Sequence, residues 1–92
     1  MAIVTLRYWA AAKEAAGTAE ETVMAGTLAE VLATARGSDD KRGDAGQDPR
    51  LRAILARSSF LVDGAPVGTR APEAVMLADA AVIEVLPPFA GG

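Results

Sequence analysis

Apolar and polar residues alternate over the first segment of the chain. Even positions are apolar and Thr5 and Arg7 lie between them, so the period of two predicts a β-strand over residues 2–8 with one face on a core. Ile3 interrupts this alternation on the odd side. Further extended segments are predicted where apolar runs are bounded by turn residues: 21–25, 59–62, 66–67 and 81–86.

Between these strands, a period of three to four predicts helices. Thr27 and Glu30 match a capping box, which places a helix start at Thr27. The apolar stripe that follows consists of Leu28, Val31, Leu32 and Ala35. A shorter helix is predicted over residues 10–16, with Gly17 suited to the left-handed position after it.

A third helix is predicted to begin at Pro49, with Asp48 as its N-cap. Its apolar face is formed by Leu51, Ile54 and Leu55. Residues 38–47, which precede it, are polar and glycine-rich without periodicity, so they predict a flexible loop.

The carboxyl end carries the most distinctive sequence. Pro87-Pro88-Phe89-Ala90 follows the last predicted strand, and Gly91-Gly92 follows these residues. The prolines favour an extended path, and glycines fit a channel too narrow for side chains. Extended, these six residues span roughly 20 Å. We therefore expect a domain over residues 1–86 and a flexible tail over 87–92 that presents the Gly92 carboxylate. The alternative is a frayed terminus.

Composition limits what the chain can catalyse alone. It has 92 residues, enough for one small domain, and contains neither cysteine nor histidine. Disulfides, Cys/His zinc sites, cysteine nucleophiles and histidine acid–base chemistry are therefore excluded. The acidic residues near 39–48 lack the spacing of a calcium loop. We expect a non-catalytic protein with no metal site.

Charge and hydropathy bear on partners and location. The net charge of −3 argues against nucleic acid as a partner. No apolar run reaches the length of a membrane span, and the first residues lack the basic start of a signal peptide. We expect a cytoplasmic protein that does not bind membranes.

The order of the predicted elements indicates an α+β fold. Two strands, a helix and further strands, the last leading into the tail, are typical of the β-grasp (ubiquitin-like) fold, a mixed sheet packed on one main helix. Residues 6–17, LRYWAAAKEAAG, resemble the opening motif of the MoaD family, the sulfur carrier subunit of molybdopterin synthase within the MoaD/ThiS superfamily. Residues 83–92, IEVLPPFAGG, resemble its C-terminal signature, and Val62-Asp63-Gly64 resembles its Val-Asn-Gly turn.

The resemblance implies a sulfur carrier in molybdenum-cofactor synthesis. In that family a ubiquitin-activating-type enzyme (MoeB-like) uses ATP to adenylate the terminal glycine, and a sulfur donor system converts it to a thiocarboxylate. The tail then enters the large molybdopterin synthase subunit (MoaE-like), where two carriers convert cyclic pyranopterin monophosphate into a dithiolene. No cofactor is bound permanently. By this resemblance Gly92 is the reactive residue and Gly91 and Ala90 thread the channel. The positions that correspond to partner contacts are Trp9, Pro66, Leu86, Pro87, Pro88 and Phe89.

Strand phases support part of this assignment independently. Trp9 continues the odd face of the first strand, and Leu86 shares a face with Glu84, opposite Ile83 and Val85. In a β-grasp sheet the first and last strands are parallel neighbours, so Trp9 and Leu86 are expected beside the root of the tail as an exposed docking patch. The alternative places Trp9 under the first short helix as core.

Three other functions are compatible with the sequence to different degrees. A sulfur carrier for thiamine or cysteine synthesis shares the fold and tail but has another acceptor. A ubiquitin-like protein modifier forms isopeptide bonds to lysines. A small enzyme is disfavoured by the missing histidine and cysteine.

Overall fold

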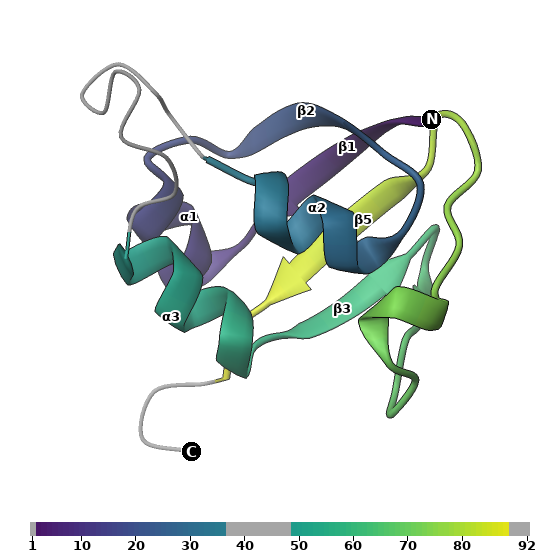
Figure 1. The fold of residues 1–92 in the computed structure, drawn as a ribbon. Coiled ribbons are helices and arrows are strands. Elements are labelled where there is room, and N and C mark those ends of the chain that lie inside the picture. The colour runs from purple at the N-terminus through teal and green to yellow at the C-terminus, as the bar shows by residue number, and fades with distance from the viewer. Residues whose placement is uncertain (1, 37–48, 89–92) are drawn as a thin grey trace.

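The computed structural model describes residues 2–36 and 49–88, which form one mixed sheet with helices packed against it (Figure 1). In chain order the elements are β1 (Ala2–Tyr8), α1 (Ala10–Ala16), β2 (Glu20–Ala25), α2 (Leu28–Thr34), α3 (Pro49–Arg57), β3 (Ser59–Val62), β4 (Ala65–Pro66), the 3-10 helix η1 (Pro72–Ala74) and β5 (Val82–Leu86).

Within these residues the strand order is β2-β1-β5-β3-β4. β1 and β5 run parallel at the centre, with Arg7 opposite Glu84 and Tyr8 opposite Val85. The other neighbouring strands are antiparallel. The predicted strands are confirmed with shifts of one residue: β2 begins at Glu20, β4 at Ala65 and β5 at Val82.

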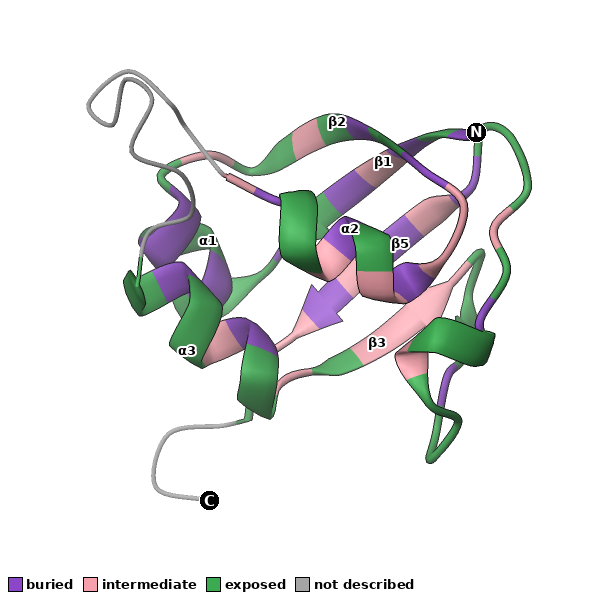
Figure 2. Cartoon of the chain, in the orientation of Figure 1, coloured by how far each residue is buried: buried purple, intermediate pink, exposed green. Residues whose placement is uncertain are grey.

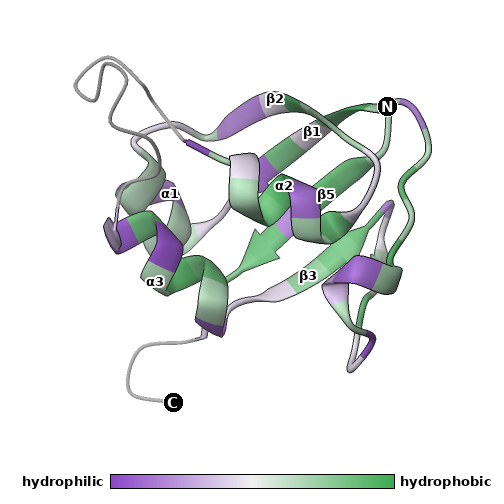
Figure 3. Cartoon of the chain, viewed as in Figure 1, coloured by the Kyte–Doolittle hydropathy of each residue, from purple (hydrophilic) through white to green (hydrophobic). Residues whose placement is uncertain are grey.

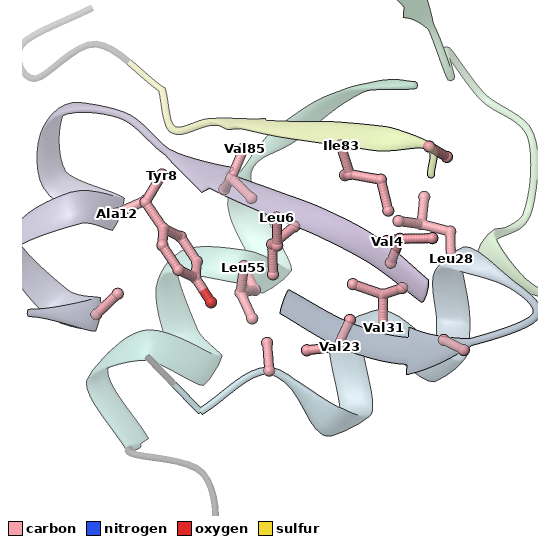
Figure 4. Packing of buried hydrophobic residues seen from close by; sticks show 14 of the residues in the cluster. Val4, Leu6, Tyr8, Ala12, Val23, Leu28, Val31, Leu55, Ile83 and Val85 are labelled. Carbon is pink, nitrogen blue, oxygen red and sulfur yellow. The ribbon is translucent and has the colours of Figure 1, made fainter. Parts of the chain in front are cut away.

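The core lies between one face of the sheet and the helices. The even residues of β1 are buried, and Figure 4 shows Val4, Leu6 and Tyr8 along β1 beside Ile83 and Val85 of β5. Helices α2 and α3 contribute further buried side chains: Leu28, Val31, Leu51 and Leu55. The alternation read from the sequence therefore gives the buried face of the sheet.

Helix α1 approaches this core through small side chains. Ala12, Ala15 and Ala16 are buried, and Gly17 ends the helix with φ 76°, as expected for a left-handed C-terminal cap. Figure 2 marks buried residues on both α1 and α3, two helices that contact each other. Alanine allows this close packing but removes little apolar surface from water, so the core is modest.

Local capping signals are realised at α2. The Glu30 backbone N–H donates to Thr27 Oγ1 (3.2 Å), and the Thr27 N–H donates to Glu30 Oε1 (3.3 Å), which completes the predicted capping box.

Figure 3 shows that β3 and β5 are mainly hydrophobic, whereas polar residues lie on the outer sides of the helices. No helix in the described ranges is both long and apolar enough to cross a lipid bilayer.

The opposite face of the sheet is not buried by these helices. Ile3 and Met24 are a register pair on β1 and β2, and their exposed fractions are 51% and 60%. Ile3 therefore interrupts the apolar–polar alternation of the sequence but not the alternation of buried and exposed side chains along β1, because it lies on the exposed face. This outer face carries the residues that the sequence places near the tail.

Candidate functional site

The candidate site lies where β1 and β5 end. Because these strands are parallel, their carboxyl ends meet at the same edge of the sheet. Trp9 follows Tyr8, and Leu86 follows Val85, the register partner of Tyr8. The structure therefore brings Trp9 and Leu86 to the point where the chain leaves the sheet at Pro87.

The exposure of these residues fits a surface site. Trp9 is 46% exposed and lies outside the buried core, so it does not pack beneath α1 as a core residue. Leu86 and Pro87 are half-buried, and Pro88 is exposed. Together, Trp9, Leu86, Pro87 and Pro88 form a partly apolar edge, called here the tail-root patch.

A sharp strand-to-helix junction positions Trp9. Its carbonyl accepts from the backbone N–H groups of Ala12 (3.0 Å) and Lys13 (3.3 Å). Ala10, the next residue, has φ 49°, a left-handed conformation that is uncommon outside glycine. A shallow hollow lies beside the ring, lined by Trp9, Ala10, Lys13, Glu14, Gly17 and Thr18.

Pro66 occupies a different part of the sheet. It pairs with Leu61 of β3, and Leu61 pairs with Glu84 of β5, so Pro66 lies two strands away from the tail strand. Pro66 is exposed, and its carbonyl accepts from Arg70 Nη2 (3.3 Å). The structure thus separates Pro66 from the tail-root patch, although both lie on strands of the same sheet.

The remaining predicted site residues lie outside the described part of the chain. These are Phe89, Ala90, Gly91 and Gly92, and the acidic segment near residues 39–48 also lies outside it. Among residues 2–36 and 49–88, no three acidic side chains are grouped to hold a metal ion.

Two acidic residues near this edge were not identified from the sequence. Glu84 Oε1 accepts a hydrogen bond from the Trp9 indole Nε1 at 3.2 Å. Glu21 accepts from the Tyr8 hydroxyl and from the Arg36 backbone N–H, whose nitrogen is 3.2 Å from each carboxylate oxygen. Glu21 lies on the face of β2 on which Val23 and Ala25 are buried. An acidic residue on that apolar face was the sequence feature that could have indicated a buried contact.

No protein-family model matches the sequence, and a comparison with curated protein sequences finds no match. Solved structures do share the fold. Small archaeal modifier protein 1 from Methanosarcina acetivorans aligns with a TM-score of 0.68 and 23% identity, over 100% of this chain and 98% of that chain. The protein of the same name from Haloferax volcanii aligns with a TM-score of 0.64 and 20% identity, over 98% of this chain and 99% of that chain.

A chain from the complex of subunits 1 and 2 of the molybdopterin-converting factor from Helicobacter pylori is also similar. It aligns with a TM-score of 0.63 and 21% identity, over 98% of this chain and 99% of that chain. The likeness extends over whole chains, so it includes the parallel β1–β5 pair that forms the candidate site. The expected α+β fold is confirmed: the chain has a β-grasp fold, and its resemblance to the MoaD family holds at the level of that fold.

Proposed function

We propose that this chain is a sulfur carrier that donates sulfur from a thiocarboxylate on Gly92 in molybdopterin synthesis, as the small subunit of a molybdopterin synthase. The observation that carries the proposal is the arrangement at one sheet edge. The exposed Trp9, Leu86 and the Pro87-Pro88 exit lie together, directly before a Gly-Gly sequence. A partner that binds this edge is therefore placed so that the tail enters it in a defined direction.

The chemistry needs no catalytic side chain from this protein. The Gly92 carboxylate attacks the α-phosphate of ATP on an activating enzyme, which forms an acyl-adenylate and releases pyrophosphate. A sulfur nucleophile from a donor system then displaces AMP and leaves a thiocarboxylate. Two carriers in turn supply the two sulfurs of a dithiolene on cyclic pyranopterin monophosphate. The absence of cysteine and histidine is compatible with this division of labour, because the acids and bases belong to the partners.

The tail-root patch is the proposed contact with the large subunit. Aromatic residues are enriched among interface anchors, and Trp9 is an exposed aromatic residue at this edge. Phe89 extends the contact toward the channel, with Ala90 and Gly91 threading it, and Pro66 contacts the rim of the same partner. In support, the Helicobacter pylori protein of this fold was solved in a complex of subunits 1 and 2.

A protein modifier is the second candidate, because two of the similar structures are small archaeal modifier proteins. It uses the same activated Gly92 but transfers the acyl group to a lysine amine. A sulfur carrier for thiamine or cysteine synthesis differs in the acceptor alone. All three functions place the chain in the cytoplasm, where ATP and activating enzymes are present.

Intact-mass measurement followed by a product assay separates these functions. The chain is incubated with ATP, a sulfur source and an activating enzyme of the MoeB type. We expect a mass gain equal to the replacement of one oxygen by sulfur at Gly92. Addition of the large subunit and cyclic pyranopterin monophosphate should then yield the dithiolene. Protein ladders on a gel without dithiolene would instead identify a modifier.

A further inference from the structure

Glu84 makes a side-chain contact that the proposed sulfur transfer does not use. Its side chain is on the outer face of β5, and its Oε1 lies 3.2 Å from the indole nitrogen of Trp9. We propose that Glu84 is a positioning residue, which holds the Trp9 ring in its docking orientation beside the tail. The docking part of this inference rests on the proposed function, whereas the positioning of the ring does not.

Glu84 is well placed for this because its own backbone is fixed. β5 lies between β1 and β3, and Glu84 is paired with Arg7 on one side and Leu61 on the other. The Arg7 side chain in turn lies near Glu20, with Nε 3.8 Å from Oε1. The carboxylate that accepts from Trp9 therefore belongs to a row of charged residues across β2, β1 and β5.

The backbone of Trp9 is restrained by different contacts. Its carbonyl accepts from Ala12 and Lys13, and Ala10 turns the chain with φ 49°. These contacts leave the two side-chain torsions of Trp9 undetermined. A hydrogen bond from the indole nitrogen, at the far end of the ring, to an oxygen of residue 84 restrains both torsions.

A ring that is already oriented loses less freedom when the partner binds. Ordering one side chain at an interface weakens affinity by about 2- to 12-fold, so removing the Glu84 contact should raise the Kd by that factor. The effect should act on binding far more than on folding, because Glu84 and Trp9 both lie outside the buried core.

Trp9 is the single tryptophan of the chain, so intrinsic fluorescence reports on this ring alone. In the free protein, Glu84→Ala should increase fast depolarisation in time-resolved anisotropy and increase quenching by acrylamide. Glu84→Gln retains a carbonyl oxygen as acceptor and should stay near the wild type. Glu73→Ala removes the same charge from an exposed site on η1 and serves as the control.

The same variants are then titrated with the large subunit. We expect weaker binding for Glu84→Ala, near wild-type binding for Glu84→Gln and Glu73→Ala, and similar melting temperatures throughout. Unchanged anisotropy in Glu84→Ala, or equal mobility in the Ala and Gln variants, would overturn the positioning role. If the wild type does not bind the large subunit while the anisotropy changes as expected, the positioning stands and the proposed function fails.

Discussion

Replacing Trp9 with alanine separates a docking residue from a core residue. A buried tryptophan removes up to about 250 Å² from water. Trp9 is 46% exposed, so roughly half of that area contributes to folding. At about 25 cal/mol per Å², and with allowance for a compact unfolded chain, Trp9→Ala should cost about 2 kcal/mol of folding free energy.

Replacing a fully buried tryptophan with alanine costs about 3–5 kcal/mol of folding free energy, so the cost expected for Trp9 is smaller. For a domain of this size it corresponds to a fall in melting temperature of about 8–16 °C. The variant should therefore stay folded at low temperature, where binding is measured. If Trp9 anchors the large subunit, its loss should weaken binding by about 30- to 1000-fold.

Calorimetric titration below 20 °C, on samples shown to be folded by circular dichroism, measures the affinity for the large subunit separately from the loss of folding stability. Met24→Ala is the matched control: it truncates an exposed apolar residue on the same sheet face, on β2 instead of at the tail root. The control should bind as the wild type does. An unchanged Kd for Trp9→Ala, together with a stability loss of core size, would refute the docking role.

Three further changes test the tail, the Glu21 contact and the helix cap. Gly91→Val should abolish sulfur transfer with little change in melting temperature, because a β-branched side chain restricts the backbone that must thread a channel; normal transfer would refute this. Tyr8→Phe should lower the unfolding free energy by about 1–2 kcal/mol in urea titration, since it removes the hydrogen bond to Glu21; an unchanged midpoint would contradict it. Thr27→Ala should cost about 1 kcal/mol in the same assay, and no loss would show that the cap is not stabilising.

The features of the fold that sequence predicts are those set by local periodicity and capping. The even residues of β1 and the pair Ile83 and Val85 face the core as expected, and Thr27 caps α2 through Glu30. Each of these signals is contained within one turn or one strand. Even Ile3, which disturbs the pattern, follows the phase of its strand and is exposed.

Contacts between distant segments could not be predicted in the same way. The Trp9–Glu84 hydrogen bond joins residues separated by 75 positions and depends on the parallel register of β1 and β5. No helix or strand is predicted between residues 67 and 81, yet Val75 is buried and its carbonyl accepts from the Leu28 N–H at the start of α2. Such pairings follow from the tertiary arrangement, which local propensity does not specify.

The central claim is that the Gly92 carboxylate is the group that carries sulfur. The most direct test compares the natural chain with one extended by a single alanine after Gly92, in a reconstituted synthase supplied with ATP, a sulfur donor and the activating enzyme. Intact mass establishes each carboxyl end before and after the reaction. We predict that the natural chain forms the thiocarboxylate and yields dithiolene, and that the extended chain has the same melting temperature but yields none. Dithiolene formed at the natural rate by the intact extended chain would contradict the claim.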